Sequence, residues 1–475
     1  MRTELFVDGR FVPATSGERL RVLDPATEEL LAEVEAAGPA DVDRAVDAAR
    51  RALGGPWGTL APAERGRRLL ALAERIEAAS EALARLESRN TGKPLREARD
   101  DLAGVVKTFR YNAGAADKLE GATIPLGPSL FDATLLEPLG VTAHILPWNF
   151  PLGMLARSLA PALAAGCTAV VKPAEETPLS ALALAELLAP AGIPEGVVAV
   201  VPGTGEVAGE ALCRHPGVAG ITFTGSVATG RRVMALAAER AVPVVLELGG
   251  KNPLLVFADA DLDRLEATLV PACFENAGQV CSAASRLLVE APSVEDVTAR
   301  LVARARALRL GPGLDDPDLG PLISAAQRAR VLDWLAEAHA GGAQILTGGR
   351  PPAVPARGFF LEPTVLRRVP PDCRLAREEV FAPVVTIEPF ASESEAVALA
   401  NAGAYGLVAG VFTRDLARAL RLARALEAGS VWVNGWYLGG QQAPVGGVKA
   451  SGFGRERGLP GLFNYLRLKN LAIAL

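Results

Sequence analysis

The chain has 475 residues, half of them hydrophobic and 22% charged, and it carries a net charge of −5. Its length predicts two or three domains with cores large enough to enclose an active site. The acidic balance argues against a general nucleic-acid-binding protein, and the lack of an apolar run of about 18 residues argues against a membrane partner.

The amino-terminal stretch predicts a short hairpin followed by two structural helices. Residues 5–12 surround Asp8-Gly9, a typical hairpin turn. Residues 41–53 and 62–80 keep apolar side chains at helical spacing behind Pro39 and Pro62, which stand where a helix start tolerates proline. We expect both helices to pack against a core and to carry no chemistry.

From residue 140 onward, short apolar runs alternate with helical segments. Strands are predicted over 141–146, 168–171, 197–201, 220–223 and 242–246, with helices over 152–165, 178–188, 206–213 and 227–239. This alternation predicts a parallel α/β sheet covered by helices, in which ligands gather at the carboxyl ends of the strands. The segment 248–451 alternates again, with long helices over 294–308 and 325–340, and predicts a second α/β domain.

The numbers and spacing of histidine and cysteine limit the kinds of active site and the cellular compartment that we expect. Three scattered histidines argue against a metal site, so we expect no metal and a carboxylate in any general-base role. Five cysteines without a CxxC spacing favour a reduced, cytoplasmic compartment. The amino terminus also lacks the long apolar stretch of a signal peptide.

Strand ends in the first domain carry candidate ligand contacts. The glycines of 203–209 have the wrong spacing for a dinucleotide fingerprint and favour a plain strand-to-helix turn. Gly225 and Ser226 open a helix, where they either hold a phosphate or simply cap the helix. Lys172 and Glu175 at another strand end either grip a ribose and a phosphate or are solvated.

Glu247 and Cys281 are the candidates for chemistry. Glu247 ends a strand before Gly249 and Gly250, so its carboxylate either approaches a ligand closely or is solvated beside an ordinary turn. Cys281 follows the glycine-containing turn 276–280 and is either a reactive thiol or a buried, inert one. The other four cysteines are expected to be buried and inert.

Several short motifs occur together in a set order along the chain. They are Trp148-Asn-Phe-Pro151, Lys172-Pro-Ala-Glu175, Phe223-Thr-Gly-Ser226, Glu247-Leu-Gly-Gly-Lys-Asn-Pro253, Gly278-Gln-Val-Cys281, Glu379-Val-Phe-Ala-Pro383 and Gly446-Gly-Val-Lys-Ala-Ser-Gly452. This ordered set closely resembles the NAD(P)-dependent aldehyde dehydrogenase superfamily. With Thr91-Gly-Lys-Pro94 and Tyr405-Gly-Leu407, the resemblance covers essentially the whole chain.

The resemblance implies an α/β subunit of three parts. A Rossmann-like coenzyme domain is expected from residues 1–119 and 141–247, and a catalytic domain from 248–451. A small β oligomerisation element is expected from 120–140 and 452–475. Family members are usually dimers or tetramers, so we expect a homodimer or homotetramer.

The resemblance also implies the catalytic roles. Cys281 resembles the nucleophile, and because a free thiol titrates near about 8.5, it needs activation. Asn149 and the Cys281 N–H resemble the oxyanion hole, in which one donor is typically worth about 3–4 kcal/mol. Glu247 resembles the general base that activates water to hydrolyse the thioester left after oxidation, and it can also help to deprotonate Cys281.

The coenzyme contacts are implied in the same way. Lys172 and Glu175 resemble the contacts to the adenosine ribose, and because a carboxylate repels a 2′-phosphate, NAD is favoured over NADP. Ser226 and the turn that it begins resemble the pyrophosphate site, and Glu379 resembles the nicotinamide-ribose contact. The full set of further expected contacts is Pro147, Trp148, Gly225, Ser226, Gly230, Leu248, Glu379 and Phe381.

The expected substrate pocket departs from the common family pattern. Its walls are expected to be Phe150, Met154, Arg157, Val280, Ser282, Gly439 and Val445. Val445 stands where many family members have an aromatic residue, and Gly439 stands where many have a larger side chain. These differences suggest altered pocket walls and do not identify the substrate. Arg157 stands where succinic-semialdehyde-type members have arginine, and it either binds a substrate carboxylate or forms a structural salt bridge.

Hydrolytic, NAD-dependent oxidation of an aldehyde is therefore the favoured function, with a semialdehyde as the hypothesised substrate. A CoA-acylating semialdehyde dehydrogenase is an alternative, but acylating relatives commonly lack the base at Glu247. A catalytically silent structural relative is the other alternative. It would require the loss of Cys281 or Asn149, and both are present.

Overall fold

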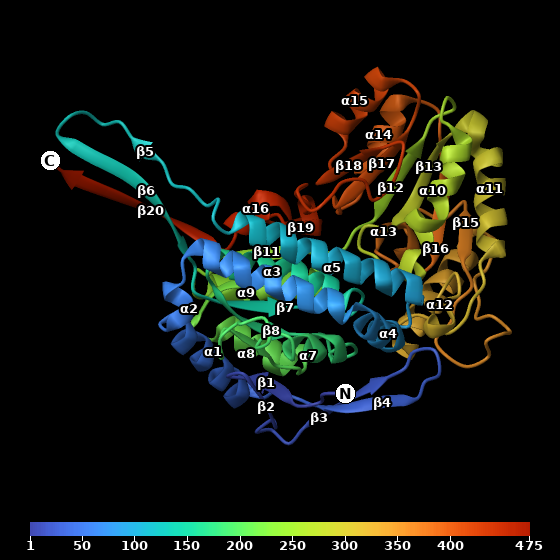
Figure 1. Cartoon of the computed structure of the whole chain (residues 1–475). Helices are drawn as coiled ribbons and strands as arrows, with labels where there is room; N and C mark the ends of the chain where they lie inside the picture. Colours follow the sequence, from blue (N-terminus) through green and yellow to red (C-terminus); the bar gives the residue numbers. More distant parts are fainter.

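The computed structural model describes residues 1–475, which form two large sheets, a short ribbon and a protruding arm (Figure 1). The eight-stranded first sheet has the order β19-β11-β10-β7-β8-β9-β1-β2. Its strands are β1 (Leu5–Val7), β2 (Arg10–Val12), β7 (Val141–Ile145), β8 (Thr168–Lys172), β9 (Val198–Val200), β10 (Val218–Thr224), β11 (Val244–Glu247) and β19 (Gly452–Phe453). The ribbon pairs β3 (Arg19–Leu23) with β4 (Leu30–Glu35).

The centre of the first sheet is parallel, as the sequence predicts. β7 pairs with β8 on one side and with β10 on the other, so the chain reverses its direction of travel across the sheet at this point. Such a reversal leaves a crevice at the carboxyl ends of the two strands. The loops that follow β7 and β10 therefore stand where a ligand is expected.

Helices cover both faces of this sheet. One core contains α1 (Pro39–Leu53), α8 (Glu210–Arg214) and α9 (Val227–Ala238), and the other contains α3 (Pro62–Ala78), α5 (Leu95–Ala115), α6 (Pro151–Ala165) and α7 (Leu179–Ala185). The short α2 (Pro56–Thr59) and the longer α4 (Ser80–Thr91) join this second layer. Because α6 lies between the sheet and α5, it is apolar almost all round.

The seven-stranded second sheet has the order β14-β15-β16-β13-β12-β17-β18. Its strands are β12 (Asn252–Val256), β13 (Ala284–Glu290), β14 (Gln344–Thr347), β15 (Thr364–Arg367), β16 (Val384–Phe390), β17 (Val408–Phe412) and β18 (Ser430–Val433). Its helices are α10 (Leu262–Phe274), α11 (Val294–Ala307), α12 (Ala325–Ala340), α13 (Arg374–Arg377), α14 (Glu393–Asn401) and α15 (Leu416–Ala425). All pairs except β14–β15 are parallel, which confirms the second α/β unit.

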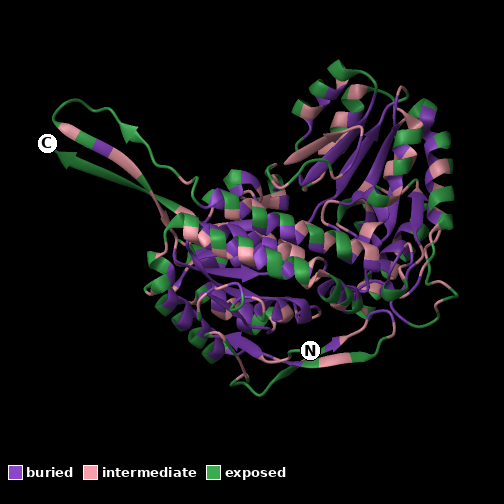
Figure 2. Cartoon of the chain, viewed as in Figure 1, coloured by how far each residue is buried: buried purple, intermediate pink, exposed green.

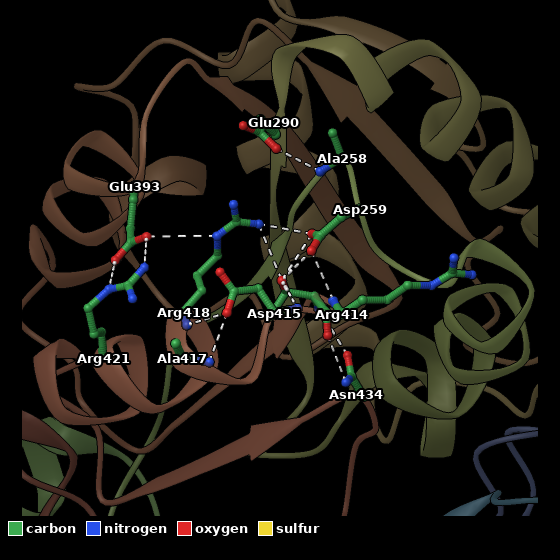
Figure 3. Close-up of polar contacts among 11 residues, drawn as sticks. Ala258, Asp259, Glu290, Glu393, Arg414, Asp415, Ala417, Arg418, Arg421 and Asn434 are labelled. Atoms are coloured by element: carbon green, nitrogen blue, oxygen red, sulfur yellow. Dashed lines mark hydrogen bonds and ion pairs between the residues drawn. The ribbon is translucent and has the colours of Figure 1, made fainter.

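A polar network closes the carboxyl edge of the second sheet (Figure 3). Asp259, just after β12, accepts hydrogen bonds from the Thr413 hydroxyl at 2.9 Å and pairs with Arg418 at 2.9 Å. Asn434, just after β18, bonds the Thr413 N–H at 3.0 Å and its carbonyl at 2.9 Å. These side chains satisfy one another's hydrogen-bonding capacity. The carboxyl edge, where parallel sheets commonly bind ligands, therefore has a structural role in this sheet.

The arm consists of β5 (Thr123–Ile124), β6 (Leu130–Pro138) and β20 (Leu466–Ala474), and it extends away from the body (Figure 1). Nearly every residue of β20 is exposed (Figure 2). The expected start of this element at Gly452 is wrong, because Gly452 and Phe453 form β19 and pair with β11 in the first sheet. The helix α16 (Gly458–Phe463) then leads to the arm.

Most predicted strands and helices are confirmed with small shifts of their ends. One helix differs, because the segment predicted over 206–213 begins as a π-helical turn, Gly205–Gly209, before α8. None of the helices combines the length and the apolar character that crossing a membrane requires.

Candidate active site

The three predicted catalytic residues come from both sheets. Glu247 is the last residue of β11, and Asn149 lies in the loop after β7. Cys281 precedes β13, at the amino edge of the second sheet. The site therefore lies where the carboxyl edge of one sheet faces the amino edge of the other, and both Glu247 and Cys281 line one cavity there.

An unusual backbone turn delivers Cys281. Asn276, Ala277 and Gly278 all have positive φ angles, of 48°, 56° and 68°. A side chain on Gly278 would collide with the Ala382 carbonyl, so the close approach requires glycine. Strained turns of this kind persist only where surrounding contacts hold them, and here buried side chains supply those contacts.

Three buried amide side chains hold the turn. Gln279 accepts a hydrogen bond from the Ile323 N–H at 2.9 Å. Asn252 donates to the carbonyls of Cys281 and Ala283, both at 2.8 Å. Asn149 donates through Nδ2 to the Gln279 carbonyl at 2.8 Å, so the predicted oxyanion donor is anchored to the nucleophile turn itself.

The environment of Cys281 favours the neutral thiol. Burial raises its pKa to about 12, and Arg157 acts in the opposite direction. A base is therefore needed to form the thiolate. The other four cysteines are buried, as expected, and Cys281 alone is partly exposed.

Glu247 is a buried carboxyl with an unused oxygen. Its Oε1 has no hydrogen-bond partner. Burial raises its pKa well above the ordinary value, the charge of Glu456 raises it further, and Arg157 acts in the opposite direction. Gly446 makes room for this carboxyl, since an added Cβ would lie 2.9 Å from Oε1. A carboxyl with a raised pKa and a free oxygen is suited to proton transfer.

Lys172 and Glu175 meet at the end of β8. Lys172 is buried and donates to the Gly203 carbonyl at 2.7 Å. Its ammonium lies 3.5 Å from the Glu175 carboxylate, which also accepts a hydrogen bond from the Gly205 N–H. The pair is thus preorganised beside the turn 203–209, with Glu175 half-exposed and able to accept a hydrogen bond from a ribose hydroxyl.

The turn after β10 also has the expected form. Ser226 caps α9, and its Oγ accepts a hydrogen bond from the Thr229 N–H at 3.2 Å. The first N–H groups of this helix are available to an anion. Gly230 lets Leu248 pack closely, because a Cβ there would lie 2.5 Å from a Leu248 methyl.

Glu379 and the aromatic pair complete the predicted coenzyme contacts. Glu379 accepts a hydrogen bond from the Gly250 N–H at 2.9 Å, and a side chain on Gly249 would collide with its carboxylate. Trp148, which follows Pro147, stacks edge-on against Phe381 at 5.2 Å between ring centroids. These side chains come from both sheets, so they fit a ligand that extends across the crevice.

The cavity beside Cys281 has a volume of about 370 Å³. Every residue expected in the substrate pocket lines it, namely Phe150, Met154, Arg157, Val280, Ser282, Gly439 and Val445. Gly439 has a φ of 124°, so a larger side chain there would strain the backbone. The sequence interpretation missed further wall residues: Asp100, Asp101, Glu275, Trp432, Tyr437 and Arg457.

Arg157 forms a structural salt bridge, one of the two roles left open by its sequence position, and it also stands in the cavity wall. It lines the cavity, and its guanidinium also lies 2.6 Å from the buried carboxylate of Glu456. Its Nε is buried without a hydrogen-bond partner. Removal of Arg157 would therefore leave Glu456 as an uncompensated buried charge near Glu247.

Comparisons with known proteins agree with this geometry. The aldehyde dehydrogenase family model matches residues 11–471. The peroxisomal aminoaldehyde dehydrogenase 1 of Pisum sativum is 43% identical over 98% of this chain and 95% of its own length. Human retinal dehydrogenase 2 is also 43% identical, over 99% of this chain and 92% of its own.

A solved structure gives the same result at the level of the fold. The NAD+ complex of an aldehyde dehydrogenase from Bacillus cereus matches with a TM-score of 0.98 and 41% identity, covering 100% of this chain and 97% of that one. The chain therefore belongs to the aldehyde dehydrogenase family and is an enzyme that oxidises aldehydes.

Proposed function

We propose that this enzyme oxidises an aldehyde to a carboxylic acid with NAD+, through a covalent intermediate on Cys281. The observation that carries the proposal is the convergence of Cys281, Glu247 and Asn149 on one cavity, with the coenzyme contacts beside it. An aldehyde carbon releases its hydrogen with two electrons only after a nucleophile has made it tetrahedral. The Cys281 thiolate is that nucleophile.

The first step requires a base and an oxyanion site. Glu247 takes the thiol proton, and Cys281 Sγ then attacks the aldehyde carbon. The Asn149 amide carries two N–H donors, of which one bonds the Gln279 carbonyl and the other is free for the developing oxyanion. The Cys281 N–H has no acceptor within the protein and supplies the second donor.

The coenzyme residues fit NAD+. Bound NAD+ supplies the two-electron acceptor that converts the adduct on Cys281 to a thioester. The half-exposed Glu175 carboxylate would accept a hydrogen bond from a ribose hydroxyl and would repel a 2′-phosphate, which favours NAD over NADP. The NAD+ complex of the Bacillus cereus relative supports the same coenzyme.

Release of the acid is the second task of Glu247. Once Glu247 has passed the thiol proton to solvent, its unpartnered Oε1 accepts a proton from water, and the water oxygen attacks the thioester carbon. The sulfur leaves as a thiolate, and the product is a carboxylic acid. The presence of this base favours water over coenzyme A as the acceptor of the acyl group.

The substrate proposed is a semialdehyde, an aldehyde with a distal carboxylate. The two arginines in the wall of the cavity, Arg157 and Arg457, support this choice, because a guanidinium matches a carboxylate in shape and charge. The pea relative is named for aminoaldehydes, whose distal group has the opposite charge, so substrate charge is the question to test.

We also propose that the enzyme is a homo-oligomer in a reducing, cytoplasmic compartment. The exposed arm β5–β6–β20 supports assembly between copies, either as a dimer or as a tetramer. All five cysteines are free thiols, which supports the reducing compartment.

An absorbance assay for NADH with a panel of aldehydes tests the reaction. We expect Cys281→Ser to lower turnover more than about a thousandfold, because a hydroxyl is a far weaker nucleophile than a thiolate. Binding of NAD+, followed by quenching of protein fluorescence, should stay nearly unchanged. Near-normal NADH production by the serine variant would refute the assignment of Cys281.

A further inference from the structure

Arg457 is a cavity residue that the mechanism above does not use. It stands directly before α16 with a φ of 58°, in a stretch that the sequence placed in the arm. The pairing of β19 with β11 brings this stretch back to the active site instead. The Arg457 side chain lines the same cavity as Cys281, Glu247 and Arg157.

Arg457 differs from its neighbouring arginines because nothing in the protein neutralises it. Arg157 is paired with Glu456 at 2.6 Å. Arg455 donates to the carbonyls of Gly447 and Gly454, at 3.0 and 2.6 Å. Arg457 forms no ion pair and no side-chain hydrogen bond, and its buried Nε has no partner. A cation largely removed from water without a partner is costly, so its presence at a cavity indicates an anionic ligand.

The other charges that face the cavity leave this cation available. Glu456 is engaged by Arg157, and the raised pKa of Glu247 favours its neutral form. Part of the cavity lining is acidic. There Asp101 is paired with Lys93 at 2.5 Å, while Asp100 is exposed and Glu275 has a pKa raised by burial to about 7.

The protonation of Arg457 is secure despite its surroundings. Burial lowers the pKa of its guanidinium to about 10, and the like charge of Arg157 contributes to the shift. The group is therefore still charged at neutral pH. A carboxylate that entered the cavity would offset the free-energy cost of burying the Arg457 charge. It would also reduce the repulsion between Arg457 and Arg157.

We propose that Arg457 is a specificity-determining residue that binds the distal carboxylate of the substrate, while Arg157 mainly positions Glu456. This assignment rests on the proposed semialdehyde function and names the group that recognises the substrate. The planar guanidinium donates parallel hydrogen bonds to both carboxylate oxygens. The aldehyde end of the same molecule then lies at Cys281.

Three aldehydes that differ in their distal charge test the proposal: succinic semialdehyde, butanal and 4-(trimethylammonio)butanal. In Arg457→Met, which keeps the aliphatic stem, we expect kcat/KM for succinic semialdehyde to fall about ten- to a hundredfold, mainly through KM. Butanal should fall much less, and only by the share that reflects the charge of Arg457 acting on Glu247. Arg457→Lys should recover part of the loss, because it restores the charge without the planar fork.

Two controls separate this role from a structural one. Arg424→Met removes an exposed arginine on α15 that does not line the cavity, and kcat/KM for all three aldehydes should stay unchanged. Arg157→Met should lower kcat for all three aldehydes together, because it exposes Glu247 to the unpaired Glu456 charge. An equal fall for all aldehydes in Arg457→Met, or wild-type preference for the cationic aldehyde, would overturn the proposal.

A binding measurement distinguishes failure of this proposal from failure of the proposed function. Succinate carries a carboxylate but cannot be oxidised, and we expect it to protect Cys281 of the wild type against alkylation by iodoacetamide, measured by intact mass. Protection should be lost in Arg457→Met and kept in Arg424→Met. If succinate protects Cys281 but the enzyme oxidises no aldehyde, the carboxylate site at Arg457 stands and the proposed function is refuted. If the enzyme oxidises aldehydes but succinate gives no protection, the proposed function stands and the site at Arg457 is refuted.

Discussion

At the Glu247 carboxyl, burial and the nearby Glu456 charge both favour the protonated form. Arg157, Arg455 and Arg457 oppose them, but the net pKa stays raised. A base with a raised pKa is stronger once it is ionised, yet it is ionised only at higher pH. The reaction step that depends on Glu247 should therefore speed up as pH rises through this shifted pKa.

This leads to a prediction for Glu247→Gln. The amide cannot take a proton from water, so we expect kcat to fall about a hundred- to ten-thousandfold while the thioester still forms. Wild-type kcat should rise with pH above the ordinary carboxyl range of about 4.3, and the variant should lose that rise. Stopped-flow NADH traces and intact mass would reveal a burst and an acyl adduct.

The matched control is Glu388→Gln, a partly buried carboxylate that pairs with Arg286 at 3.2 Å, away from the cavity. It should keep both the turnover and the pH profile of the wild type. Equal turnover in Glu247→Gln and wild type would remove Glu247 from the mechanism.

The sequence predicted some site residues better than others, for a physical reason. Glu247 and Lys172 end strands, Ser226 precedes a helix, and Cys281 follows a glycine-containing turn, so local patterns predict their positions. Their expected roles came from the family resemblance. Arg457 reaches the cavity only because β19 returns to β11, a pairing between segments far apart in the chain. No local pattern encodes that return, so Arg457 was assigned to the arm and not to the site.

At the scale of an element, the nucleophile turn depends on Asn252 at the start of β12. Asn252 is buried and bonds the carbonyls of Cys281 and Ala283 and the N–H of Val408. We expect Asn252→Ala to leave these groups unpaired, at about 1–3 kcal/mol each, and to release the turn. Thermal unfolding should occur at a lower temperature, and kcat should fall at least about tenfold.

Asn401→Ala is the comparison for this loss. Asn401 also bonds two backbone groups, of Ala425 and Glu427, but it lies away from Cys281. It should lower the unfolding temperature without a matching loss of kcat. If Asn252→Ala lowered stability while kcat stayed at the wild-type value, the clamp would have no part in positioning the nucleophile.

Element prediction succeeded where the periodicity was strong. The hairpin, α1, α3 and the five central strands of the first sheet follow alternations visible in the sequence. The long α5, which brings Asp100 and Asp101 to the cavity, had not been assigned. The π-helical turn before α8 was not predicted either. A contact distant in sequence accompanies it, because Glu175 accepts a hydrogen bond from the Gly205 N–H.

At the scale of the whole molecule, the two sheets use opposite edges. The first sheet presents its carboxyl edge, as expected for a parallel sheet that binds a coenzyme. The second presents its amino edge, with Cys281 before β13 and Asn252 at the start of β12, because polar pairs fill its carboxyl edge (Figure 3). The general rule therefore agrees with the expected place of the coenzyme contacts, but it does not by itself point to the proposed nucleophile.

The arm carries the last prediction, which concerns assembly. In the pairing of β6 with β20, Phe131 lies opposite Ile473, and Leu471 opposite Ala133, so these side chains share one face with Leu135. The larger ones are exposed in the single chain. Because β5 has only two residues, the arm is essentially a two-stranded ribbon, which is marginal alone in water. Its exposed apolar face leads us to expect a second copy of the chain as its partner.

We expect the double variant Leu471→Asp, Ile473→Asp to shift the protein toward monomer in size-exclusion chromatography with light scattering, because burying two carboxylates in the interface is costly. Leu416→Asp, at a leucine on α15 that is even more exposed, should leave the assembly unchanged. The isolated subunit keeps both sheets and the cavity between them, so NADH production by the monomer should persist with a lower unfolding temperature. An unchanged oligomer in the double variant, or a wild type that is already monomeric, would show that this face does not join subunits.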